Sequence, residues 1–126
     1  MAQTISLKSL HLEYRLWIAE LNYDITLIRI FNDRLVEIIA AEKDKASKVA
    51  QRLSKKLNEI RESIDGLSHR LQIEKMNLAA TARENPAYDH QIDIPANHSS
   101  IRNDFYNFRI SFNELKSDFL SYQSVG

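Results

Sequence analysis

The chain contains no cysteine and only two glycines and two prolines among its 126 residues. Without cysteine, a disulfide framework, a thiolate zinc site and a cysteine nucleophile are all excluded. With so few glycines, a glycine-rich phosphate-binding loop is not expected either. The scarcity of both residues leaves most of the chain free to form regular helix.

No single sign of charge dominates, because 17 basic and 17 acidic side chains balance to a formal net charge of zero. This balance argues against a dedicated binder of nucleic acid or anionic membrane, so neither partner is expected. No stretch approaches about 18 uninterrupted apolar residues, so no transmembrane helix is expected. The N-terminal residues lack the pattern of a secretory signal, and the absence of cysteine fits a reducing compartment. We therefore expect a cytoplasmic protein.

The C-terminal third of the chain carries large apolar residues at alternating steps of four and three. They are Ile101, Phe105, Phe108, Phe112, Leu115, Phe119 and Tyr122. Only an α-helix places such a series on one stripe, and that stripe must be buried against other helices. The spacing predicts a helix over about residues 98–122, capped by Asn97, Ser99 or Ser100.

Two earlier segments repeat this rhythm and predict helices over about residues 5–41 and 44–83. The core positions of the first are Leu7, Leu10, Tyr14, Trp17, Leu21, Ile28, Phe31, Leu35 and Ile38. The core positions of the second are Ala46, Val49, Leu53, Leu57, Ile60, Ile64, Leu67, Leu71 and Leu78. Thr4 or Ser6 is expected to cap the first helix. Together the three helices predict an all-α antiparallel bundle that forms a single domain over residues 1–126.

One charged residue interrupts the first row, and a glycine lies inside the second helix without breaking its pattern. Asp24 occupies a core position, and we expect it to pair with Arg61 or to accept hydrogen bonds, because a lone buried carboxylate is costly. Gly66 lies inside the second helix at a cost of roughly 1 kcal/mol relative to alanine. A glycine there is expected to let a bulky side chain such as Trp17 or Phe112 approach the backbone.

The first joint, residues 40–47, is polar but contains neither glycine nor proline. The chain either turns here into an antiparallel hairpin or continues as one helix, which would be roughly 115 Å long from about residue 5 to 82. We favour the hairpin, because the apolar spacing lapses over residues 42–45 and compact bundles use helices of ordinary length.

The second joint is clear, because Pro86 cannot continue a helix and disfavours helix in the residue before it. Residues 84–97 are therefore predicted to form a loop. Its apolar residues Tyr88, Ile92 and Ile94 are expected to lie across the end of the bundle, since a long loop in a small domain is usually anchored.

Helix lengths suggest where a partner binds. The first two helices would each be about 55 Å long and the third about 36 Å, so the third covers the others only to about residue 28 and from about residue 57. The remaining hairpin tip, residues 29–56, would expose Phe31, Leu35, Val36, Ile38, Ile39, Val49 and Leu53. Such apolar surface usually marks an interaction site, so we predict a homodimer or a helical protein partner at the tip. Alternatively, lysine and arginine stems shield the tip and the chain is monomeric.

Histidines and acidic residues supply a second hypothesis, a bundle that binds a metal or a small ligand. The predicted topology gathers His11, His90, Asp93 and His98 at the loop end, and such side chains can ligate zinc. Their spacing matches no short metal motif, and the Glu-x-x-His steps of carboxylate-bridged metal bundles are absent. We therefore expect no metal and no other cofactor.

A weaker hypothesis places nucleic acid or a membrane surface against the basic segment 43–56. Its basic residues are Lys43, Lys45, Lys48, Arg52, Lys55 and Lys56. No aromatic residues are interleaved to stack on bases, so a solvated helix face is the better interpretation. No serine lies in a strand–turn–helix elbow, so the chain is not expected to be an enzyme. The leading interpretation is a non-enzymatic interaction or scaffold protein.

The pattern also resembles a family of short, uncharacterised bacterial helical proteins. The first helix carries the resemblance in His11, Glu13, Trp17, Glu20-Leu21, Phe31 and Arg34-Leu35. The third helix carries it in His98, Arg102, Phe105, Phe108, Phe112, Leu115-Lys116 and Phe119. The resemblance implies a helical fold and a bacterial cytosolic setting without an activity. It also draws attention to His11 and His98, and His98 is expected to cap the third helix or to pair with a carboxylate of the first.

Overall fold

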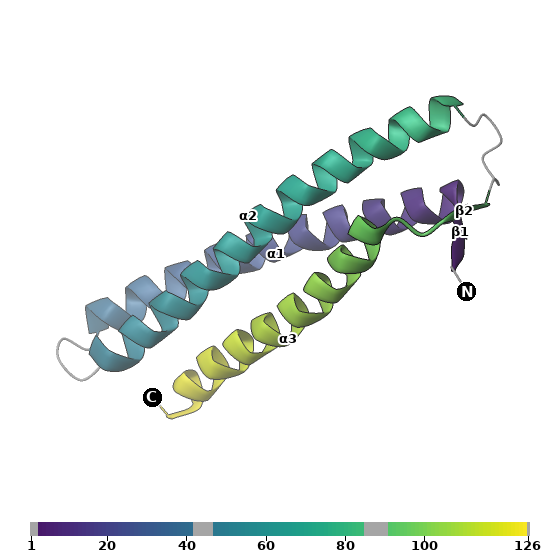
Figure 1. Cartoon of the computed structure of the whole chain (residues 1–126). Coiled ribbons are helices and arrows are strands. Elements are labelled where there is room, and N and C mark those ends of the chain that lie inside the picture. The colour runs from purple at the N-terminus through teal and green to yellow at the C-terminus, as the bar shows by residue number, and fades with distance from the viewer. Residues whose placement is uncertain (1–2, 42–46, 85–90, 126) are drawn as a thin grey trace.

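The computed structural model describes residues 3–41, 47–84 and 91–125. Its elements, in chain order, are β1 (Thr4–Ser6), α1 (Leu7–Ala41), α2 (Ser47–Glu84), β2 (Gln91–Asp93) and α3 (Ala96–Val125). Helices α1 and α2 lie side by side and antiparallel, and α3 runs back along them in the direction of α1 (Figure 1). The predicted antiparallel three-helix bundle is confirmed, and the alternative of one continuous helix is wrong. Residues 42–46, which connect α1 to α2 in the sequence, lie outside the described residues.

Helix α1 begins where the sequence offers a side-chain cap. The Ser6 hydroxyl accepts a hydrogen bond from the backbone N–H of Ser9 at 3.1 Å, which satisfies one of the free amides of the first turn. Ser6 is therefore confirmed as the cap, and the helix starts at Leu7 rather than near residue 5.

Helix α3 begins two residues earlier than predicted, at Ala96. The carbonyl of Pro95 accepts hydrogen bonds from the backbone N–H groups of His98 (3.0 Å) and Ser99 (3.3 Å), so Pro95 precedes the first turn. The three predicted caps, Asn97, Ser99 and Ser100, lie inside the helix, and that prediction is wrong. The fixed backbone of proline lets the chain enter the helix directly from β2.

A short antiparallel strand pair closes the loop end, which the sequence did not predict. Ile5 of β1 lies opposite Ile92 of β2, and both pack against the core. The N–H of Ile94 extends the pairing by donating to the carbonyl of Gln3 at 3.0 Å. Ile92 therefore anchors this end of the bundle as expected, while Tyr88 lies outside the described residues.

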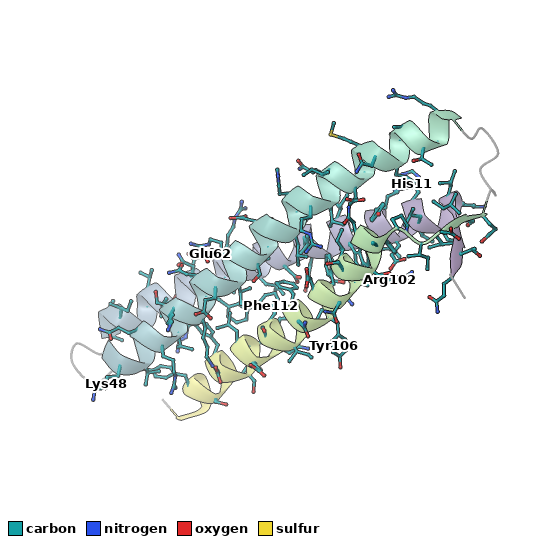
Figure 2. All side chains as sticks on the ribbon, in the orientation of Figure 1. His11, Lys48, Glu62, Arg102, Tyr106 and Phe112 are labelled. Carbon is teal, nitrogen blue, oxygen red and sulfur yellow. The ribbon has the colours of Figure 1, made fainter. Side chains whose placement is uncertain are left out.

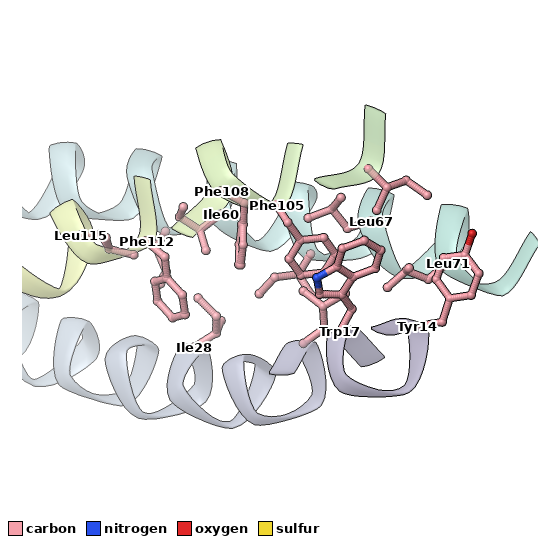
Figure 3. Close-up of a cluster of buried hydrophobic side chains, with 14 of the residues drawn as sticks. Tyr14, Trp17, Ile28, Ile60, Leu67, Leu71, Phe105, Phe108, Phe112 and Leu115 are labelled. Carbon is pink, nitrogen blue, oxygen red and sulfur yellow. The ribbon is translucent and has the colours of Figure 1, made fainter. Parts of the chain in front are cut away.

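The core is a continuous apolar seam between the three helices. Figure 3 shows Phe105, Phe108 and Phe112 of α3 directed towards Trp17 and Ile28 of α1. Helix α2 packs directly against both other helices, whereas α1 and α3 meet through large side chains: the rings of Trp17 and Phe105 stack with centroids 5.0 Å apart. No helix in the described part of the chain is long and apolar enough to cross a membrane.

The hairpin tip is covered further than the sequence predicted. Helix α3 has 30 residues, and the ring of Phe119 lies 4.8 Å from that of Phe31. Near the other edge of the tip, Lys56 of α2 pairs with Asp118 of α3. The cover of α3 therefore extends about one turn past residue 28 of α1, where the prediction ended it, whereas the Lys56 contact agrees with the predicted limit of about residue 57 on α2. Helix α3 is longer than predicted by five residues, or roughly one and a half turns.

Gly66 does not serve a close helix contact. It is exposed, and a Cβ added to it would meet no atom within 4 Å. The predicted approach of Trp17 or Phe112 is therefore wrong. Gly66 instead lines a shallow groove of about 350 Å³ between α2 and α3, with Ser63 and Ser111 nearby.

Candidate functional site

A buried histidine lies at the first turn of α3, where that helix packs on the start of α1. The side chain of His98 is 0 % exposed, and its Nε2 lies 3.0 Å from Oε2 of Glu13. The same carboxylate accepts two hydrogen bonds from Arg102, at 2.7 Å and 2.8 Å. Glu13 therefore joins two α3 side chains to α1, as expected from the alternative in which His98 pairs with a carboxylate of the first helix.

Aromatic rings enclose the imidazole of His98. Its centroid lies 5.1 Å from that of Trp17, and Tyr14 meets it edge-on at 5.2 Å. Its other nitrogen, Nδ1, is buried and has no hydrogen-bond partner in the described part of the chain. Burial raises the pKa of Tyr14 to about 12, with the charges of Glu74 and Glu13 adding to the effect. Burial therefore favours the neutral forms of Tyr14 and His98.

The two acid–base groups of the cluster are each held in one protonation state. Burial lowers the pKa of His98 below its ordinary value, although Glu13 opposes the shift. Burial would raise the pKa of Glu13, but its hydrogen bond to Arg102 and the charges of His98 and Arg102 outweigh burial and lower it. The cluster therefore holds a neutral imidazole against an ionised carboxylate near neutral pH.

The Glu13–Arg102 pair, in which an arginine of α3 donates two hydrogen bonds to a glutamate of α1, is here called a Glu–Arg clamp. A second clamp lies one heptad later along the contact between α1 and α3. Arg109 donates two hydrogen bonds to Glu20, at 2.9 Å and 2.7 Å. Because each clamp joins residues 89 positions apart, the two clamps fix α1 and α3 in parallel register. Bidentate pairs of this kind define geometry as well as adding energy.

Asp24 follows these clamps on α1 and is nearly buried, at 6 % exposure. Burial raises its pKa, Glu20 adds to the shift, and Lys116 and Arg109 oppose it. The expected partner Arg61 is exposed on α2, so the pairing with Arg61 is wrong. The cations that face Asp24 come from α3, because α3 packs on this side of α1.

The predicted metal ligands do not converge in the described part of the chain. The Nε2 atom of His98 is hydrogen-bonded to Glu13, and Asp93 is exposed on β2. His11 lines a small hollow of about 160 Å³ with Leu7 and Leu78, and His90 lies outside the described residues. Within residues 3–41, 47–84 and 91–125, no three histidine, aspartate or glutamate side chains are placed to hold a metal ion.

The basic segment lies at the tip, at the opposite end of the bundle from His11 (Figure 2). Lys48, Arg52 and Lys55 are exposed, as a solvated helix face requires, whereas Lys56 pairs with Asp118. Lys43 and Lys45 fall outside the described residues.

The predicted tip interface separates into buried and exposed residues. Leu35, Ile38 and Leu53 belong to the core of the single chain, and Phe31 and Val49 are partly buried against it. Only Val36 and Ile39 remain largely exposed, at 58 % and 54 %. The accessible apolar surface of the tip is therefore smaller than the sequence suggested.

The sequence interpretation overlooked a second apolar row on α1, here named the outward stripe. Its members are Leu12, Leu16, Ala19, Tyr23, Thr26 and Ile30. They follow the same alternating steps of four and three as the core row but lie on the opposite side of the helix. The four large residues are 56 % (Leu12), 60 % (Leu16), 64 % (Tyr23) and 57 % (Ile30) exposed. The heptad spacing of the outward stripe is present in the sequence, but the core row of the same helix contains more large apolar residues and gives the stronger pattern.

No protein-family model, curated protein or solved structure matches this chain.

Proposed function

We propose that this protein is a non-enzymatic helical interaction module that self-associates through the outward stripe of α1. The observation that supports the proposal is that α1 is apolar on two opposite faces. One face fills the core of the chain, and the other presents large apolar side chains that are more than half exposed. Isolated exposed apolar residues are normal, but a row at heptad spacing has the geometry of a coiled-coil seam.

The composition of the stripe favours a second copy of the chain as the partner. Large residues alternate with the small residues Ala19 and Thr26, which leave room for facing side chains. One flank carries Lys8 and Arg15, which are exposed and make no ion pair within the described residues. The other flank carries Glu13 and Glu20, whose side chains are 25 % and 31 % exposed.

This charge distribution favours a parallel, in-register pair of α1 helices. In a parallel pair, a residue on one flank meets the residue five positions later on the partner. Lys8 would then face the partner's Glu13, and Arg15 would face the partner's Glu20. An antiparallel pair would instead set like flanks against each other, so that Lys8 and Arg15 would meet the basic flank of the partner. Opposite charges across the seam therefore select the parallel arrangement.

Light scattering on a size-exclusion column, across protein concentration, tests this proposal. The wild-type chain is expected at twice its monomer mass of 14.7 kDa. Leu16→Glu combined with Tyr23→Glu should give the monomer mass, because each chain would place two charges in the seam. Met76→Glu is the matched control, since Met76 is 73 % exposed on α2 and away from the stripe.

A second double variant separates the stripe from the tip. Val36→Glu combined with Ile39→Glu should retain the dimer if the stripe is the interface. A loss of the dimer in this variant, with the stripe variant unaffected, would move the interface to the tip. A wild-type chain that stays monomeric at every concentration would contradict self-association.

The setting of the protein is also part of the proposal. A reducing cytoplasm is supported by the lack of cysteine, and a bacterial source by the resemblance of the two helical patterns. Metal binding and association with nucleic acid or a membrane surface stay as alternatives that no specific observation in the described residues favours.

A further inference from the structure

His98 is unusual in being completely buried while one of its ring nitrogens has no partner. Nε2 faces the carboxylate of Glu13 at 3.0 Å, and Nδ1 is buried and finds no hydrogen-bond partner among the described residues. Because Glu13 is held ionised, Nε2 carries the proton and donates to it, and Nδ1 is left with a bare lone pair. The neutral ring pays a modest desolvation cost for that lone pair.

Adding a proton to Nδ1 raises the free-energy cost of keeping the ring buried. The ring would then carry a charge and an N–H donor that faces aromatic surface and no acceptor. The full desolvation cost of an unsatisfied donor, together with that of a poorly solvated charge, would favour exposure of the ring to water. His98 lies on the first turn of α3, so the ring reaches water when the start of α3 leaves α1.

We propose that His98 is an acid-sensitive latch whose protonation at Nδ1 releases the first turns of α3 from α1. Release would uncover the aromatic surface formed by Trp17 and Phe105, which the closed bundle buries. The two Glu–Arg clamps differ in their response. The Glu13–Arg102 clamp shares its carboxylate with His98, whereas the Glu20–Arg109 clamp does not and would keep the remainder of α3 in place.

Charged groups from all three helices face His98. Glu13 of α1 and Glu74 of α2 favour the charged ring, Arg102 of α3 disfavours it, and burial disfavours it most. The pKa of His98 therefore lies below its ordinary value of 6.5 in the folded chain. Tyr14, the other titratable neighbour, stays neutral because its pKa is about 12.

Because folding lowers the pKa of His98, the stability of the closed bundle should fall as the pH falls. A histidine whose pKa is lowered by folding leaves stability at its maximum above pH 6.5. Stability is then lost as the pH falls from 6.5 to the folded pKa, because only the released ring takes up a proton in that range. The released fraction should grow by about tenfold for each pH unit in that range, as one proton requires. Glu13, whose pKa is also lowered, acts in the same direction below its ordinary value of 4.5.

Trp17 reports on the latch, because it is the only tryptophan and touches the imidazole. Between pH 8 and pH 4.5, the full-length chain should show a red shift of tryptophan emission. In the same samples, an NMR titration should show the His98 ring and the Trp17 indole N–H changing together, with a midpoint below 6.5. His98→Gln should abolish this transition, since glutamine keeps a donor for Glu13 but takes up no proton. His69→Gln, which removes an exposed histidine of α2, is the matched control and should retain it.

Amide hydrogen exchange of the wild-type chain gives an independent measurement if His98→Gln fails to fold. After correction for intrinsic rates, protection of residues 98–105 should be lost at pH 5 while that of residues 112–119 is kept. The latch would be refuted if His98 titrates while Trp17 and residues 98–105 are unchanged. It would equally be refuted if the transition persists in His98→Gln.

Discussion

Phe119 distinguishes a covered hairpin tip from an open one. Its side chain is 1 % exposed, and its ring lies 4.8 Å from that of Phe31 on α1. The next residue, Leu120, is 64 % exposed on the same helix turn. Phe119→Ala and Leu120→Ala therefore form a matched pair that removes a large apolar side chain from inside and from outside the bundle.

The cost of Phe119→Ala can be worked from its burial. Removing a fully buried phenylalanine costs about 3–5 kcal/mol, the sum of lost transfer energy and the cavity left behind. At about 2.1 cal/mol/K per residue, the 126 residues give an unfolding entropy of about 0.26 kcal/mol/K. The melting temperature should therefore fall by about 11–19 °C. Leu120→Ala should change stability by less than about 0.5 kcal/mol, as is usual for an exposed position.

Thermal and urea unfolding, followed by circular dichroism and Trp17 fluorescence, would measure both variants under identical conditions. The free energies should be compared at one protein concentration, because self-association would raise the apparent stability. Equal effects of the two substitutions would show that α3 does not seal the tip. The open arm predicted from helix lengths would then be correct, and the burial of Phe119 would be refuted.

Two further substitutions test local features of the fold. Gly66→Ala should raise the stability by up to about 1 kcal/mol in chemical denaturation, because the helix gains propensity and the new Cβ meets open space; a loss of stability would show a contact at this position. Asp24→Leu should stabilise the chain at pH 7, because burial disfavours the ionised carboxylate and raises its pKa. Folding raises the pKa of Asp24, so the ionised carboxylate destabilises the folded chain at pH values above that pKa. The stability gained by Asp24→Leu should therefore shrink as the pH falls below it. Asp33→Leu, at an exposed position of α1, is the matched control and should not stabilise the chain in this way.

The helices themselves were predictable from local pattern. The apolar rows of α2 and α3 indicate which side of each of these helices must be buried, because an apolar stripe faces the neighbouring helices. Helix ends were less predictable. Ser6 caps α1 as expected, but Pro95 precedes α3 in place of the three residues with better capping side chains. The start of α3 is set by the way the chain enters it from β2. Because β2 pairs with the distant strand β1, the residues around Pro95 carry little sequence signal for this start.

The site was only partly visible in the sequence. Glu13, Glu20, Arg102 and Arg109 look like surface residues on any helical wheel, and their pairing depends on the parallel register of α1 and α3. The aromatic surroundings of His98 likewise depend on that register, because Trp17 and Tyr14 are more than 80 positions away along the chain.

Sequence alone therefore determined the fold class, the number of helices and most of the core, since each of these follows from the period of apolar residues along one segment. Only the tertiary structure decided how far α3 extends over the tip, which cations face Asp24, and which apolar row of α1 stays exposed. Those outcomes depend on the relative register of helices that are far apart in the chain. Register is set by the sum of many contacts between segments, and no single segment encodes it.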